Sequence, residues 1–494
     1  MTNYIYKYGI SNIIFYKLEP FAVREVDLKQ LSGDFRQDTA ELDRLLRVGN
    51  SFDLIRKEIQ ICGGKLVLYY IDGLTKDDSM LRLIQFFYGL KEPIGDAASF
   101  LLKCMPYVEA DVSEETEKLL QSVLSGATVA LGETFGTSAV IIDARTYPAR
   151  NTEDPESDKV LQGARDGFVE TLIFNTALIR RRIRDPALSF SYYSVGDSSH
   201  TDVCVAYMEG RADSAYVSRV KKLISSLRCD ALPMGQQSLA EVILPRGWLN
   251  PFPKVRYTER PDTAAAQLLE GNIILLCDTS PLAMILPTSV FDFMQETDDY
   301  MLPPLTGCYL RLVRHLSFLL SVFFTPLWLI FSSHPAWLPD WLAFILPSGE
   351  ARLPVLAQLL LGEFIIDALK LASLNTPSLL AGSLSAIAGL ILGDFAVDVG
   401  WMIPEVVLYM AFVAVVSFAQ PGIELGFAFK FIRLMMLVLS ALLDFPGFFI
   451  GLGITFLLLI TNRTVAGKRF YLYPLIPFNG AALSRLLFRR KKRD

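Results

Sequence analysis

The pattern of hydrophobic and polar positions changes near residue 305 of this 494-residue chain. Before that point, short apolar runs alternate with amphipathic stretches, which predicts strands and helices in alternation. After it, several apolar stretches reach about 20 residues, enough to cross roughly 30 Å of hydrocarbon at 1.5 Å per residue. We therefore predict an α/β cytosolic N-terminal part with two subdomains, followed by an α-helical multi-pass membrane domain of four to six spans.

The first subdomain is predicted at residues 38–148, between an N-terminal extension at 1–37 and a polar, proline-containing linker at 149–159. Its opening stretch is interpreted as two helices broken at Gly49-Asn50. An apolar run ending in Asp-Gly then predicts a buried strand and a turn. The predicted elements are helices within 39–61, a strand at 65–74, helices at 80–88 and 113–124, and strands at 127–133 and 138–145.

The second subdomain is predicted at residues 160–304 and opens with a helix at 164–185. Five positions on that helix fall at steps of three and four and therefore share one face. They are Phe168, Leu172, Asn175, Ile179 and Ile183. If this face is buried, the Asn175 amide needs hydrogen-bond partners, because an unpaired buried amide costs about 1–3 kcal/mol. Strands at 189–195 and 201–209, a helix at 212–227 and a strand at 272–288 complete the unit.

Four arginines crowd the end of the same predicted helix, where positive charge suits the helix dipole. They are Arg180, Arg181, Arg182 and Arg184. Such a cluster can bind a phosphate or a lipid headgroup. It is also typical of a solvated helix end or of a salt-bridged interface between domains, and we favour these structural interpretations.

The helical membrane domain is predicted at residues 305–465 and a basic cytoplasmic tail at 466–494. The tail ends in FRRKKRD, and positive charge after a last apolar segment indicates the cytoplasmic side. With a cytoplasmic N-terminal part as well, the number of crossings must be even. The candidate spans are 310–331, 353–373, 378–400, 404–419, 425–445 and 447–461, and the segment 334–348 between the first two is expected at the membrane interface.

Acidic residues inside these candidate spans form the predicted ion pathway. Glu363 and Asp367 are four residues apart, as are Asp394 and Asp398, so each pair lies on one helical face. A charge in hydrocarbon costs at least about 2.5–3.5 kcal/mol and therefore faces protein, water or a transport route. Two interpretations stay open, namely a carboxylate-lined cation route and ion pairing, for example of Asp367 with Lys370.

Composition supports a membrane protein, and the sequence contains no feature that indicates an enzyme, a metal site or a nucleic-acid-binding protein. The chain is 52% hydrophobic and 20% charged, which is too apolar for an ordinary soluble enzyme. Its formal charge of −5 gives no reason to expect a nucleic-acid partner, and no signal peptide opens the sequence. The six cysteines lack zinc-ligand spacing, and no nucleotide-binding or hydrolase motif is found. We expect no cofactor, no metal and no enzymatic activity.

Four stretches together resemble the A-subunit family of GerA-type spore germination receptors. They are residues 163–188, 248–262, 277–288 and 393–411. The resemblance implies an inner-membrane protein of the bacterial endospore that works with other spore germination membrane proteins. It also implies assembly into an oligomer, with a pentamer as the expected form, and passage of monovalent cations. Residues 48–80 and 473–479 are similar to one branch of the family, for which an amplifying role is implied.

The first functional hypothesis is therefore an oligomeric cation-conducting channel subunit that amplifies germination signalling. The alternative is a non-conducting membrane scaffold that assembles other germination proteins, suggested by the large N-terminal part without a catalytic motif. A secondary transporter is less favoured, because no inverted repeat relates the two halves of the membrane domain.

Overall fold

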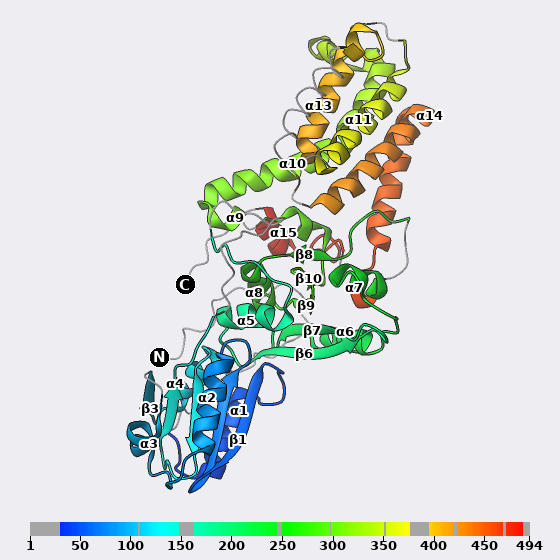
Figure 1. Ribbon diagram of the computed structural model, residues 1–494. Helices are drawn as coiled ribbons and strands as arrows, with labels where there is room; N and C mark the ends of the chain where they lie inside the picture. The colour runs from blue at the N-terminus through cyan, green and yellow to red at the C-terminus, as the bar shows by residue number, and fades with distance from the viewer. Residues whose placement is uncertain are drawn as a thin grey trace.

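The computed structural model describes residues 30–106, 109–147, 163–244, 249–296, 298–349, 352–375, 395–418, 420, 422–467 and 471–487. Figure 1 shows three parts in succession: an N-terminal α/β unit, a second α/β unit, and a helical region at the far end. The predicted linker at 149–159 and most of the predicted third span at 378–400 lie outside the described residues.

The N-terminal unit contains a five-stranded antiparallel sheet with the order β1-β2-β4-β5-β3. Side chains alternate between the two faces of β2, so Leu66 and Leu68 lie in one core while Val67 and Tyr69 lie in the other. Helices α1 and α4 cover one face, and α2 and α3 cover the other. The elements are α1 Phe35–Leu46, β1 Leu54–Ile61, β2 Gly64–Ile71, α2 Asp77–Tyr88, α3 Ala97–Cys104, β3 Ala110–Ser113, α4 Thr116–Leu124, β4 Thr128–Gly132 and β5 Ala139–Ile142.

The predicted second helix within 39–61 is wrong, because those residues form strand β1. Strand β1 pairs with β2 along its whole length, from Leu54 opposite Ile71 to Ile61 opposite Gly64. The hairpin turn uses Gly63 at φ 94°, a conformation that glycine adopts readily. The buried residues near the end of β1 alternate with exposed ones, which is the period of a strand.

The second unit repeats the architecture with a sheet of order β6-β7-β9-β10-β8, again antiparallel throughout. Helices α5 and α8 pack on one face of this sheet, and α6 and α7 pack on the other. The elements are α5 Leu172–Arg182, β6 Leu188–Val195, β7 Thr201–Met208, α6 Ser214–Ser225, α7 Gln236–Ile243, β8 Arg256–Thr258, α8 Pro261–Leu269, β9 Ile273–Cys277 and β10 Ala283–Leu286.

Two predictions in this unit need correction, and one is confirmed. The single strand predicted at 272–288 is the hairpin of β9 and β10, which turns where Thr279 adopts φ 62°. Helix α5 starts at Leu172, eight residues later than predicted. Its predicted inward face is nevertheless buried, and the Asn175 amide pairs with both the N–H (2.8 Å) and the carbonyl (2.6 Å) of Val169.

Among the described residues of the helical region, two helices are long and apolar enough to cross a membrane, α10 and α14. Helix α14 holds one residue with a non-helical backbone, Asp444 (φ 56°, ψ −140°), where the chain reverses. Beyond this turn Gly447 lies against Leu439, and a Cβ on Gly447 would overlap with the Leu439 carbonyl oxygen. The longer helices are α10 Pro304–Ser333, α11 Val355–Asn375, α13 Pro404–Phe418 and α14 Ile423–Thr461, with the short α9 Asp298–Met301 before them.

After α14 the chain returns to the second α/β unit. Val465 is fully buried in the core that contains helix α6, and its carbonyl accepts a 3.1 Å hydrogen bond from the Tyr216 hydroxyl. Further on, the Tyr471 carbonyl accepts from the Val290 N–H at 2.8 Å. Helix α15 (Gly480–Leu487) packs against α10. The C-terminal segment, residues 462–467 and 471–487, is therefore part of the folded body.

Candidate functional site

The centre of the helical region holds a buried ion pair between helices α11 and α14. The Arg433 guanidinium donates two hydrogen bonds to the Glu363 carboxylate, at 2.6 Å from Nε and 2.9 Å from Nη2. A third, from Nη1, reaches the Ser321 carbonyl of α10 at 2.6 Å. Both charged side chains are at most 4% exposed. This two-pronged, charge-assisted geometry is the strongest form of arginine–carboxylate pairing.

Three further charged side chains extend this pair into the interhelical charge cluster, defined as Glu363, Asp367, Lys370, Lys430 and Arg433. The Lys430 ammonium pairs with Asp367 and also lies 3.9 Å from Glu363. The Lys370 ammonium donates to the Ser417 hydroxyl of α13 at 3.2 Å. The cluster thus links α10, α11, α13 and α14, and each of its carboxylates faces at least one cation.

The other predicted pathway residues lie away from this cluster. Asp398 is exposed in a short helical stretch that follows residues outside the description. Asp394 lies outside the described residues. A further acidic residue, Asp444 at the turn of α14, also lies away from the cluster, with its carboxylate 3.7 Å from the His334 ring. In this conformation Glu363 and Asp367 are therefore matched by positive charge, and the cluster offers a closed network rather than a row of free carboxylates.

The four arginines at and just after the end of helix α5 have four different environments. Arg180 is 1% exposed and binds Asp53 of the N-terminal unit through Nε (2.8 Å) and Nη2 (3.1 Å). Arg182 pairs with Asp166, and the Arg181 guanidinium lies 4.2 Å from the Tyr147 ring centre. Arg184 is exposed. Arg180 thus sits at the interface between the two α/β units, one of the two structural placements considered from the sequence.

A second buried charge network, missed by the sequence analysis, joins the α/β half to helix α10. Asp299, in the short helix α9, is fully buried and accepts from Arg311 at 3.2 Å and from Arg314 at 2.8 Å. Arg314 also donates to the Met294 carbonyl at 3.1 Å. The only sequence signal was the three-residue spacing of the two arginines at the start of the first candidate span.

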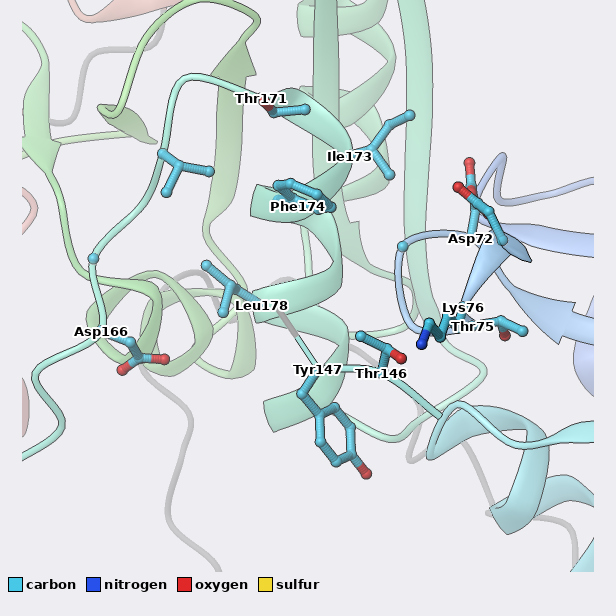
Figure 2. A pocket seen from close by; sticks show the side chains of 14 residues that line it. Asp72, Thr75, Lys76, Thr146, Tyr147, Asp166, Thr171, Ile173, Phe174 and Leu178 are labelled. Carbon is cyan, nitrogen blue, oxygen red and sulfur yellow. The ribbon is translucent and has the colours of Figure 1, made fainter. Parts of the chain in front are cut away.

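A cleft of about 780 Å³ opens between the two α/β units (Figure 2). One wall is the turn that links β2 to α2, and the other is helix α5 with the segment before it. Gly73, at φ 76°, lets this turn approach α5, because a Cβ there would be 3.0 Å from Ile173. Beside it, burial raises the pKa of Asp72 above its ordinary 3.8, and the charge of Asp77 raises it further.

This raised pKa predicts that Asp72→Asn stabilises the protein at neutral pH. When the pKa of a carboxyl is higher in the folded than in the unfolded protein, its protonated form stabilises the fold. For Asp72 this stabilisation is fully present below pH 3.8 and is lost as the pH rises through the pKa of the folded state. Asparagine carries no charge, so the full chain in detergent should unfold at a higher temperature at pH 7. The gain should be roughly 0.5 kcal/mol or less, because Asp72 is only half-buried. An equal gain at pH 3 would show that charge is not its cause.

Two antiparallel α/β units joined to apolar helices with a buried charge cluster define a two-part protein, with an α/β half and a helical half suited to a membrane. The family described as Bacillus/Clostridium GerA spore germination protein matches residues 42–493. The chain belongs to this family. The resemblance read from four sequence stretches is therefore confirmed.

Individual relatives match over most of the chain. Stage V sporulation protein AF of Bacillus subtilis (strain 168) is 37% identical over 448 residues, covering 90% of this chain and 90% of that protein. Spore germination protein KA of the same organism is 25% identical, covering 90% and 82%. The crystal structure of the N-terminal domain of the A subunit of the Bacillus megaterium spore germinant receptor GerK3 aligns with a TM-score of 0.39 at 20% identity, over 52% of this chain and 96% of that one.

Proposed function

We propose that this chain is a subunit of an oligomeric membrane protein that conducts monovalent cations during spore germination and amplifies the germination signal. The names of its relatives, which are spore germination and sporulation proteins, support this setting. The observation that carries the proposal is the interhelical charge cluster within largely apolar helices. Ionisable groups are costly to place in a membrane and typically mark ion or substrate pathways.

The proposed location is the inner membrane of the spore, with the α/β half and the C-terminal segment in the cytoplasm. Helices α10 and α14 have the length and hydropathy of spans. Because the C-terminal segment packs against the α/β half, a chain that leaves this side through α10 must return to it. That requirement supports an even number of crossings, which both four and six satisfy.

The described conformation corresponds, in this proposal, to a closed state. Glu363 and Asp367 are matched by Arg433 and Lys430, so these carboxylates become available to a cation only when the pairs separate or exchange partners. Exposed apolar side chains on the same helices would face lipid or neighbouring copies. They include Phe364, Leu371, Leu408, Val415 and Leu442.

A non-conducting scaffold is the second candidate, and one observation favours it. Both described carboxylates of the cluster are already paired, as expected of side chains that only hold helices together. In that case the helical half anchors the chain, and the two α/β units assemble other germination proteins.

Ion flux from liposomes that contain the purified full chain tests the proposal. We expect potassium efflux at least about tenfold above protein-free liposomes, and native mass spectrometry of the detergent complex should give a multiple of 55.2 kDa. Asp398→Asn and the charge-neutral double variant Glu363→Gln/Arg433→Gln should change the rate or the potassium-to-chloride selectivity. Asp78→Asn, an exposed change on α2, is the matched control.

A monomer without flux, alone or with co-purified germination proteins, would contradict the channel and favour the scaffold. Flux that is identical in all variants would keep conduction but remove these side chains from the route.

A further inference from the structure

The junction between the second α/β unit and the long helices exposes apolar side chains from two segments of the chain. Figure 1 shows α9, the start of α10 and α15 lying between that unit and the bundle that contains α11 and α13. Soluble proteins rarely expose contiguous apolar patches larger than a few hundred Å², and larger patches mark contact with a protein or a membrane. The exposed apolar side chains at this junction therefore require something that covers them.

The first of these segments is the start of helix α10. Its exposed apolar side chains share one face, and at about 100° per residue they cover more than about 100° of the helix circumference. This face is wider than the two-position seam of a coiled coil, so it does not have the pattern of a helix that pairs with its equivalent in a second copy. The side chains are Leu305, Tyr309, Leu312, Val313, Leu316 and Leu319.

The opposite face of the same helical turns is polar and is held by the α/β half, because Arg311 and Arg314 are buried against Asp299. Helix α10 has 30 residues and is about 45 Å long at 1.5 Å per residue, about 15 Å longer than the hydrocarbon layer is thick. An extension into water would expose polar side chains, whereas this one exposes Leu305 (84%) and Leu312 (65%). The excess length is therefore best accommodated along the membrane surface.

The second segment is the turn at residues 475–478, with the sequence Leu-Ile-Pro-Phe. All four side chains are exposed, and Phe478 is 75% exposed. Before this turn, Tyr471 is buried in a core that α10 and α14 share. After it, α15 packs against α10, and the Arg311 guanidinium donates to the Leu486 carbonyl at 3.3 Å. Buried contacts on both sides therefore fix this exposed turn at the base of the long helices.

We propose that the junction surface, defined as the six exposed apolar residues of α10 and residues 475–478, lies in the interfacial layer of the lipid bilayer and holds the second α/β unit against the membrane. Interfacial segments bury an apolar face about 5–10 Å deep at the boundary of headgroups and acyl chains. Tyr309 suits this depth, because tyrosine combines an apolar ring with a polar tip. Lipid fits better than a protein partner, since the surface continues along α10 into the part with the hydropathy of a span. The proposal rests on the proposed membrane location but not on ion conduction.

The test replaces single residues of the full chain by the photo-crosslinker p-benzoylphenylalanine, in liposomes of phosphatidylcholine and phosphatidylglycerol, and identifies the adducts by mass spectrometry. We expect lipid adducts from positions Phe478 and Tyr309 at a yield at least about fivefold above that from Tyr88, because a side chain in the interfacial layer touches acyl chains. Tyr88 is the matched control, an aromatic residue 58% exposed at the end of α2 in the N-terminal unit. Phe456, exposed on α14, reports whether the long helices themselves contact lipid.

Lipid adducts from Phe478 and Tyr309, together with lipid adducts from Phe456, support the proposal. Adducts from Phe478 or Tyr309 to a second copy or to a co-purified protein, or lipid yields no higher than that from Tyr88, would overturn it even where Phe456 labels lipid. A lack of lipid adducts at Phe456 as well would remove the proposed membrane location together with this surface. The two failures are therefore distinguishable in one experiment.

Discussion

Replacing Arg180 by methionine should lower the free energy of unfolding of the full chain by about 3–5 kcal/mol. The change leaves the Asp53 carboxylate, 2% exposed, without its cation. It also removes Arg180 hydrogen bonds to the carbonyls of Asp185 (3.1 Å) and Leu188 (2.9 Å), which join the end of α5 to β6. Removing one partner of a buried pair is costly because the other charge stays desolvated.

The measurement is the urea midpoint of the full chain in detergent, with hydrogen exchange of β1 and β6 recorded in parallel. Arg180→Lys should recover little, since an ammonium cannot donate to both Asp53 oxygens and to the carbonyls in one fixed geometry. Arg184→Ala, an exposed change near the end of the same helix, should stay within about 0.5 kcal/mol. A midpoint for Arg180→Met equal to that of Arg184→Ala would mean that the pair does not hold the two units together.

Neutralising Glu363 alone should have a comparable effect in the helical half. Glu363→Gln leaves the Arg433 guanidinium, 4% exposed, without the carboxylate that accepts two of its hydrogen bonds. The expected loss is again about 3–5 kcal/mol, from an uncompensated buried charge. Thermal inactivation of the detergent-solubilised chain, read by loss of soluble protein on heating, reports this change.

A double-mutant cycle separates the pair from its surroundings. The variant Glu363→Gln/Arg433→Gln removes both charges and should recover at least about half of the single-variant loss, because neither side chain then stays buried with an unmatched charge. Lys430, 3.9 Å from Glu363, is the remaining cation that can respond. Additive losses in the double variant would show that the two side chains act independently and that their contact is incidental.

The sequence predicted the architecture better than the register of individual elements. The prediction of the inward face of α5 was correct even though the helix starts later than predicted. All five positions are buried, including Phe168, which lies in the segment before Leu172. The prediction failed in the region of β1, because buried and exposed residues alternate clearly only near the end of this strand, around Ile59 and Ile61. The pairing with β2 decides the structure there. A strand that depends on a neighbour's hydrogen bonds leaves a weak local signal.

The candidate sites depended on contacts that a single sequence does not reveal. Arg180 and Asp53 are 127 positions apart, and Arg433 and Glu363 are 70 apart. Residue type indicated that each needed a partner if buried, but not which one. For Asp367, the lysine one turn along the same helix was the example chosen, whereas the structure provides Lys430 from α14.

The return of the C-terminal segment constrains the order in which the protein forms during synthesis. Val465 belongs to the same core as Val205 of β7 and Leu275 of β9, yet it leaves the ribosome some 190 residues after Leu275, following all the long apolar helices. The second α/β unit therefore waits with an incomplete core while the helical region is made. This core is complete only after the chain up to Val465 has been synthesised and Val465 has packed into it.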